Sequence, residues 1–201
     1  MRVRGLTLHA KSRKTIWAIL CQPDGQVLYG TEFQGVAGIH DGGVMRLNQE
    51  GGVDTSFDPH VQGLVYALAL QPDLKILVGG VFKETHGQPH SHITRLNPNG
   101  HTDKDFQGVA NGSVQTIVLQ SDWKILIGGT FTQVNGTVRD HIARLNPNGS
   151  LDTTFDPKGF GVVVRKIAVQ RDGKILVGGF FDEVEGVPRT NIVRLNSSPA
   201  K

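Results

Sequence analysis

Short apolar runs alternate with polar turn residues along the chain, and this alternation predicts β-strands. Pro72 and Asp73 end one apolar run, and Asn99-Gly100 supplies the positive φ angles of a tight turn between two others. The clearest unit contains four such runs, which we name a, b, c and d in chain order: residues 65–71, 75–82, 92–97 and 102–106. Four short antiparallel strands therefore make up one structural unit.

The unit recurs along the chain with a fixed period. Asp-x-x-Phe motifs recur in the same register as Arg-Leu-Asn motifs, so chance is a poor explanation. The arginines of these motifs, at spacings of 49, 49 and 50 residues, are Arg46, Arg95, Arg144 and Arg194. Tandem four-stranded units predict an all-β protein, a β-propeller built from four four-stranded blades of 49 to 50 residues.

The repeat predicts a single propeller domain over residues 1–201, with blades at 16–57, 65–106, 114–155 and 164–196. The last blade lacks a d strand, and residues 5–8 stand in the register of one, so we expect the N-terminal strand to complete that blade. Three arrangements remain open at this stage: a closed four-bladed ring, an eight-bladed ring made by a homodimer, and a fragment of a longer array.

The repeated text resembles a known family. Residues 172–181 (DGKILVGGFF) and 144–155 (RLNPNGSLDTTF) closely resemble the delta-60 repeat family of bacterial β-propeller proteins. The resemblance implies a propeller fold in proteins often placed outside the cell or at its surface, and it implies no established activity. Blade one departs from the pattern, because Gly30-Thr31 stands where the other blades have a Gly-Gly pair.

Composition narrows the function classes. The net charge of +3 arises from 21 basic and 18 acidic residues without a basic cluster, which argues against nucleic acid as a partner. No run approaches the roughly 20 apolar residues of a membrane span, so we expect a soluble protein without membrane insertion. No signal peptide is visible before Lys11, and the compartment stays unknown.

The single cysteine, Cys21, aligns with apolar positions and is expected to be buried.

The recurring arginines Arg46, Arg95, Arg144 and Arg194 have two interpretations. They could form a ring of guanidinium groups that binds an anion. The favoured interpretation is structural: each arginine pairs with an aspartate such as Asp103 or Asp152 and fastens the blades.

Three histidines, His86, His90 and His92, lie on the loop before the c strand of blade two. Three imidazoles could hold zinc or nickel with an open coordination position. Since the group does not recur in the other blades, a solvated loop is the favoured interpretation, and no cofactor is expected.

Leu74 and Trp123 replace the turn glycines Gly25 and Gly173 between strands a and b. A positive φ at such a residue costs about 1 kcal/mol, and an apolar side chain at a hairpin tip is exposed. The two residues are expected at the same rim of adjacent blades. Either these substitutions are changes in the turn sequence that the fold tolerates, or the two residues form a contact surface for a protein or a glycan.

No Ser-His-Asp order, phosphate loop or paired carboxylates stand out, so the sequence favours a protein that is not an enzyme. We expect a non-catalytic binding or scaffolding module that presents a rim to a protein or glycan. One alternative is a metal-dependent hydrolase or lyase that uses the histidines of blade two. Another is a purely structural module of a larger repeat protein, and a homo-oligomer that completes a larger ring is also open.

Overall fold

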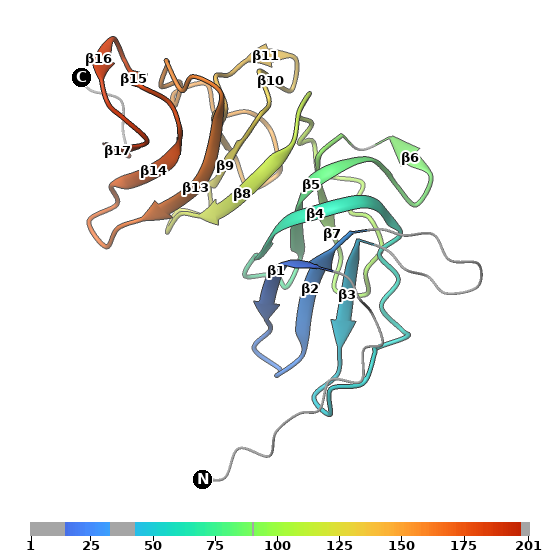
Figure 1. Ribbon diagram of the computed structural model, residues 1–201. Helices are drawn as coiled ribbons and strands as arrows, with labels where there is room; N and C mark the ends of the chain where they lie inside the picture. Colours follow the sequence, from blue (N-terminus) through green and yellow to red (C-terminus); the bar gives the residue numbers. More distant parts are fainter. Residues whose placement is uncertain (1–14, 33–42, 90, 198–201) are drawn as a thin grey trace, which may run out of the picture.

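The computed structural model describes residues 15–32, 43–89 and 91–197. Regular structure in these residues consists of 17 strands, which confirms the all-β prediction (Figure 1). Within the same residues there is no helix with the length and apolarity that crossing a membrane requires.

The described strands form six antiparallel sheets, and the four principal ones each contain an a strand, a central b strand and a c strand. The first sheet contains β1 (Ile16–Cys21), β2 (Val27–Thr31) and β3 (Val44–Leu47). The second contains β4 (Val61–Leu70), β5 (Ile76–Thr85) and β7 (Ile93–Leu96). The third contains β8 (Val114–Leu119), β9 (Ile125–Gly129) and β12 (Ile142–Leu145). The fourth contains β13 (Val163–Val169), β14 (Ile175–Phe180) and β17 (Ile192–Leu195).

Short hairpins extend the connection between the b and c strands. In the second sheet β6 (Gln88–Pro89) folds back onto the end of β5. The third blade has β10 (Gln133–Val134) paired with β11 (Thr137–Val138), and the fourth has β15 (Glu183–Val184) paired with β16 (Val187–Pro188).

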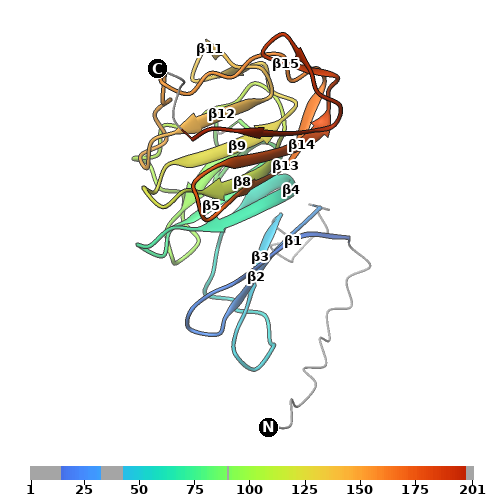
Figure 2. The same cartoon turned by 90° about the vertical axis from the view of Figure 1, so that its left-hand side faces the viewer.

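The four sheets follow one another in an arc, with the a strands on its inner side (Figures 1 and 2). Consecutive a strands contact each other: β1 lies against β4, β4 against β8, and β8 against β13. Buried apolar side chains fill the space between each pair of consecutive sheets in three clusters. Facing sheets therefore bury apolar surface against each other, as the blades of a propeller do.

The predicted d segments within the described residues are not strands, so the first, third and fourth principal sheets have three strands each, and the second has a fourth only because β6 pairs with β5. Residues 102–106 contribute one bridge, between Leu96 and Thr102, and then turn. The cause is Asp103, whose carboxylate accepts a hydrogen bond from the backbone N–H of Asp105 at 3.1 Å and ends the ladder. The expected N-terminal strand at residues 5–8 lies outside the described residues.

The first glycine of each Gly-Gly pair gives room to the next blade. A Cβ placed on Gly79 would lie 2.7 Å from Cγ1 of Val114, and one on Gly128 would lie 2.5 Å from Cγ1 of Val164. Both valines come from the a strand of the following blade and are fully buried. Any side chain at these glycines would push the next blade away.

A buried arginine fastens each described blade junction. Arg95 donates from Nε to Oδ2 of Asp103 at 2.7 Å and from Nη1 to the carbonyl oxygen of Pro147 in the next blade at 2.6 Å. Its Cζ lies 5.0 Å from the ring centre of Phe106. The same three contacts recur at Arg46 with Asp54, Pro98 and Phe57, and at Arg144 with Asp152, Ser197 and Phe155. We call this arrangement the arginine clasp.

Lysines directly before the b strands of the second and third blades strengthen the clasp. Lys75 Nζ lies 2.8 Å from Oδ2 of Asp103, and Lys124 Nζ lies 2.7 Å from Oδ2 of Asp152. Burial alone would raise the pKa of Asp103, but the hydrogen bonds from Lys75, the Asp105 backbone and Arg95 outweigh burial and lower it. The carboxylate of Asp103 is therefore ionised in the folded protein at any pH above the ordinary pKa of an aspartate.

The two ends of the arc expose faces that the inner blades bury. Ile192 is 64% exposed, whereas Ile142 at the same repeat position is fully buried. Ile16 on β1 is 46% exposed, whereas its counterpart Val65 is fully buried. The expectation of a buried Cys21 is wrong, because Cys21 is exposed on the first blade.

The clasp predicts a pH-dependent contribution to stability. Asp103→Asn should lower the free energy of unfolding at pH 7 by about 3 kcal/mol, because it leaves Arg95 without its carboxylate partner. Since the folded pKa of Asp103 is lowered, its contribution is complete above the unfolded pKa of about 4 and is lost as the pH falls below that value. Urea unfolding at pH 7 and pH 3 should therefore show a smaller acid-induced loss in Asp103→Asn than in the wild type.

Asp105→Asn is the matched control, because Asp105 lies in the same motif and is exposed. Its unfolding should follow the wild type within about 0.5 kcal/mol at both pH values. An Asp103→Asn variant with the wild-type pH dependence would show that the clasp carboxylate does not contribute in this way.

Candidate functional site

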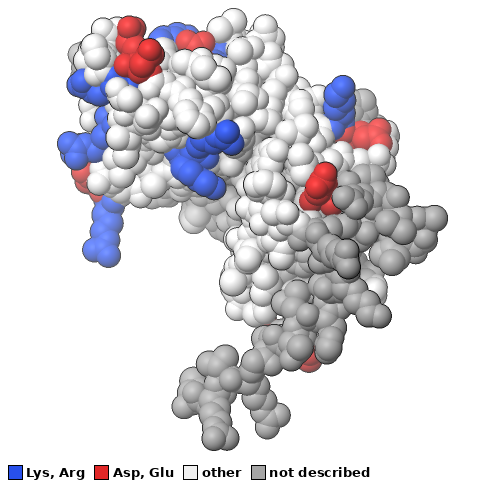
Figure 3. All heavy atoms as spheres, in the orientation of Figure 1, with Lys and Arg blue, Asp and Glu red and all other residues white. Residues whose placement is uncertain are grey.

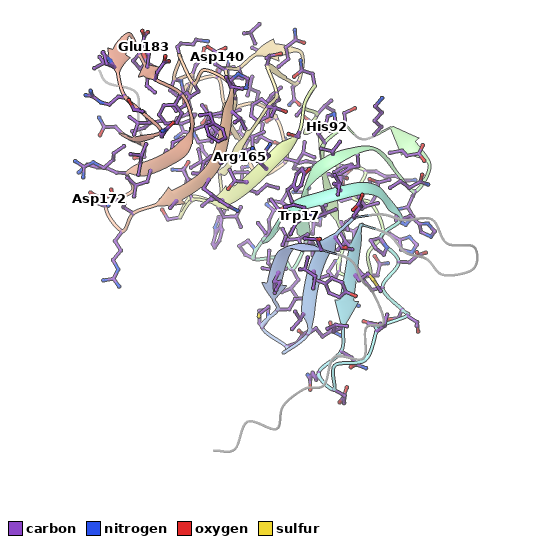
Figure 4. The ribbon with its side chains drawn as sticks, in the orientation of Figure 1. Trp17, His92, Asp140, Arg165, Asp172 and Glu183 are labelled. Carbon is purple, nitrogen blue, oxygen red and sulfur yellow. The ribbon has the colours of Figure 1, made fainter. Side chains whose placement is uncertain are left out.

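The inner strands of all four blades line one pocket, which we call the axial pocket. It has a volume of about 250 Å³ and is lined by Trp17, Tyr66, Gln115, Arg165 and Lys166. The first four residues come from β1, β4, β8 and β13 at spacings of 49, 49 and 50, so they share one repeat position. Figure 4 shows Trp17 and Arg165 on the inner side of the arc. Each blade therefore contributes the same position to one site.

That repeat position is a β-bulge in every blade. In the second blade Val65 pairs with Gly80 and Ala67 pairs with Gly79, so Tyr66 between them has no partner residue. The same register shift occurs at Trp17, Gln115 and Arg165. A bulge re-aims the side chain of its extra residue, which explains why these four residues point out of the stacked sheets.

The second glycine of the Gly-Gly pair permits the bulge. A Cβ on Gly129 would meet the carbonyl oxygen of Ser113 at 1.8 Å, far inside van der Waals contact. Blade one has Thr31 at this position, and its hydroxyl donates to the carbonyl oxygen of Thr15 at 3.1 Å. In blades two to four, glycine therefore allows the two backbones to approach closely. In blade one, the hydrogen bond from Thr31 links β2 to the residue before β1 instead.

One wall of the axial pocket is aromatic. The rings of Trp17 and Tyr66 meet edge to face, with centres 5.5 Å apart and planes at 89°. Such a pair holds both rings in fixed orientations. Trp17 stays 51% exposed, so an apolar surface remains open to a ligand.

The opposite wall is cationic. Arg165 donates from Nη1 to Oε1 of Gln115 at 3.2 Å, and its Cζ lies 5.5 Å from the ring centre of Phe180. Lys166 follows it on β13 and also lines the pocket. Lys and Arg side chains gather over β13 on the face seen in Figure 3. The pocket is thus complementary to a ligand with one flat apolar face and one negative charge.

The rim residues lie elsewhere. Leu74 and Trp123 occupy the a–b turns with φ angles of 63° and 64° and are 45% and 50% exposed. Neither lines the axial pocket. They form a second exposed apolar feature, at the hairpin tips.

The predicted histidine group of blade two does not lie together in the fold, because His86 and His92 are in different surroundings. His86 lies in the turn after β5, where Asp58 and His60 surround it, and not with His92. His92 precedes β7 and donates its backbone N–H to the carbonyl oxygen of Phe82 at 3.0 Å. Burial lowers the pKa of both His86 and His92, which favours the neutral form of both rings. His90 lies outside the described residues.

The repeat pattern matches a family model described as a "Domain of unknown function (DUF5122) beta-propeller" at residues 22–57, 71–106, 120–155 and 170–198. The chain belongs to this family. The four matches confirm the resemblance to delta-60 repeat propellers that the motifs indicate.

Solved structures resemble this DUF5122 propeller at low identity. One is provisionally named a gluconolactonase, with 16% identity, a TM-score of 0.47, and coverage of 87% of this chain and 55% of that chain. Another is a protein of unknown function from Bacteroides caccae, with 13% identity, a TM-score of 0.47, and coverage of 93% and 62%. The chain thus spans less than two thirds of either structure. No match was found among the curated proteins.

Sequence reasoning missed the axial residues of this DUF5122 chain. A signal for them exists: the preceding position holds a β-branched residue in all four repeats, whereas the bulged position differs in chemistry from blade to blade. The bulged residues are Trp17, Tyr66, Gln115 and Arg165. When one strand position varies between repeats and the position before it does not, the variable side chain is not part of the apolar packing between the sheets.

Proposed function

We propose that this DUF5122 propeller is a non-catalytic binding module whose axial pocket takes an acidic sugar unit of a glycan. The observation behind the proposal is the bulged repeat position, which directs an aromatic pair, an amide and a guanidinium group into one pocket. Aromatic rings, an amide and cationic groups line the pocket, and such groups bind a ligand and fix its orientation.

The aromatic wall suits a sugar ring. A pyranose has a face of C–H groups that packs against an aromatic ring, while its hydroxyls remain available for hydrogen bonds. Trp17 provides the exposed ring, and Tyr66 fixes its orientation by the edge-to-face contact. The volume of about 250 Å³ is below the range of pockets for drug-sized ligands, which favours a single sugar unit.

The cationic wall suits a carboxylate. Arg165 and Lys166 lie at the pocket and are both exposed, so they can reach a ligand. A guanidinium group binds a carboxylate through two parallel hydrogen bonds, and the adjacent ammonium group adds charge. A uronic acid combines the carboxylate with the apolar ring face. The extracellular or cell-surface location that the family resemblance implies would bring the protein into contact with such glycans.

The alternative contact surface is the rim with Leu74 and Trp123. Trp123 and Trp17 are 50% and 51% exposed, so the two tryptophans form a matched pair for a test. Binding should be measured on an array that pairs uronic-acid oligosaccharides with neutral oligosaccharides of the same linkage. We expect signal from the acidic members, about tenfold or more weaker in Trp17→Ala and unchanged in Trp123→Ala.

Arg165→Gln tests the charge separately. It should remove the preference for acidic over neutral oligosaccharides, because the amide retains hydrogen bonding without the positive charge. A blank array for the wild type, or a signal that Trp123→Ala abolishes and Trp17→Ala leaves intact, contradicts the axial proposal. Shortening of the oligosaccharides during the assay would instead support the hydrolase or lyase alternative.

We also propose that the exposed ends of the arc receive a further blade of this repeat, from the same protein or from a second copy. Gly178 supports this, because it occupies the position of Gly128, yet among the described residues no atom lies closer than 3.8 Å to an added Cβ. Arg194 stands at the clasp position and is exposed, whereas Arg144 is buried. The fourth blade thus presents the face that the inner blades use for stacking.

Gly128→Ala and Gly178→Ala test the end-face proposal as a pair. Gly128→Ala should lower the free energy of unfolding by about 1–3 kcal/mol, because Val164 covers Gly128. If a further blade covers the end face, Gly178→Ala should cost a similar amount, and the mass in solution distinguishes a second copy from the same chain. A Gly178→Ala variant with wild-type stability would contradict the proposal.

A further inference from the structure

Asp58, His60 and His86 form a cluster in blade two, apart from the axial pocket. One ligand-type atom from each residue lies within 4.8 Å of the other two. Oδ1 of Asp58 is 2.7 Å from Nε2 of His60, and the ring centres of His60 and His86 are 4.9 Å apart. One carboxylate and two imidazoles are a ligand set that divalent transition metals favour.

The cluster lies on a backbone contact between two loops, which we call the strut and which recurs in blades three and four. The turn after the b strand donates a backbone hydrogen bond to the loop that precedes the a strand, from His86 N–H to the His60 carbonyl oxygen at 3.2 Å. The third blade repeats this contact between Asn135 and Val109 at 2.9 Å. In the fourth blade Glu185 donates in the same way to Lys158 at 3.0 Å. The backbone geometry of the strut is therefore common to three blades.

The side chain of the strut behaves differently in blade two. In the third blade Oδ1 of Asn135 accepts from the N–H of Val109 at 2.8 Å, and in the fourth Oε1 of Glu185 accepts from the N–H of Lys158 at 2.8 Å. His86 instead places Nδ1 3.0 Å from Oγ1 of Thr102. Its Nε2 is buried and has no hydrogen-bond partner within the described part of the chain. A buried polar atom without a partner is costly and needs an explanation.

We propose that Asp58, His60 and His86 bind a divalent transition metal of the zinc class. In the tautomer whose Nδ1–H donates to Oγ1 of Thr102, Nε2 of His86 keeps its lone pair for the metal, the arrangement typical of ligating histidines. The metal would satisfy the atom that is otherwise without a partner. The ring of His101 lies 5.3 Å from that of His86 and extends the cluster.

The spacing allows coordination after small side-chain movements. Ligand atoms 2.0–2.2 Å from a tetrahedral zinc ion lie roughly 3.3–3.6 Å apart. The side chains of Asp58 and His60 are 42% and 37% exposed, so they can rotate and an ion can enter. His60 and His86 have φ angles of 38° and 51°, a strained conformation for residues other than glycine. A bound metal would hold the strut of blade two, as a side-chain hydrogen bond does in blades three and four.

The third blade supplies the test variant. His60→Val combined with His86→Asn gives blade two the strut residues of blade three, Val109 and Asn135, so the variant should fold. Isothermal titration of untagged protein with zinc chloride should show one strong site per wild-type chain and none in this variant. Cobalt should give the visible absorption bands of a four- or five-coordinate site in the wild type alone. Thr102→Ala should weaken zinc binding by about 10–100-fold, because it frees the His86 ring.

His92→Ala is the control, since His92 is close in sequence but outside the cluster. It should bind zinc as the wild type does. Failure of the wild type to bind stoichiometric zinc, or wild-type binding by the His60→Val/His86→Asn variant, would overturn the proposal. Loss of the site in His92→Ala would assign it to a different set of histidines.

Discussion

The close approach of the a and b strands at the Gly-Gly pair is the constraint on which the rest of the molecule depends. An added Cβ on Gly80 would lie 1.9 Å from the carbonyl oxygen of Leu64, so a side chain there is excluded. In blades two to four this approach accompanies a bulge in the a strand, and in blade two the bulge turns Tyr66 out of the packed sheet. The neighbouring Gly79 accepts Val114 of the next blade. In blades two and three, two adjacent glycines thus serve both the stacking of blades and the bulge of the pocket residue, whereas blade one keeps its bulge with Thr31 at the second position.

The arginine clasp complements this packing at the outer part of each junction. Glycine leaves a gap that apolar side chains fill, but such contacts do not fix the relative orientation of two sheets. The planar guanidinium of Arg95 binds Asp103 of its own blade and a carbonyl oxygen of the next, and it lies near Phe106. Lysine could not make these contacts together, because its ammonium group lacks the fixed fork of donors. Packing therefore brings the blades together, and the clasp sets their angle.

The repeat and its three principal strands could be predicted from the sequence, because apolar runs and turn residues are local signals. The d segment could not, because Thr102 to Phe106 reads as a strand until Asp103 is seen to accept from its own backbone. The axial residues required the bulge, which depends on a contact between two strands and leaves no motif of its own. The histidine group was judged by sequence proximity, whereas the fold brings His86 to His60, 26 residues earlier in the chain.

Comparison of the blades separates framework from function. The glycines, the clasp arginines and the β-branched residue before the bulge recur because each blade must stack on the next in the same way. The bulged position and the tip of the strut are not part of the apolar packing between the sheets, and the blades differ there. At the bulged position, blades one and two have aromatic residues, whereas blades three and four have Gln115 and Arg165. At the tip of the strut, blade two has His86, whereas blades three and four have Asn135 and Glu185. A repeat protein gains a site where its copies differ at positions that point away from the junctions. The axial pocket and the histidine cluster both lie at such positions, which is the physical reason to look for ligands there.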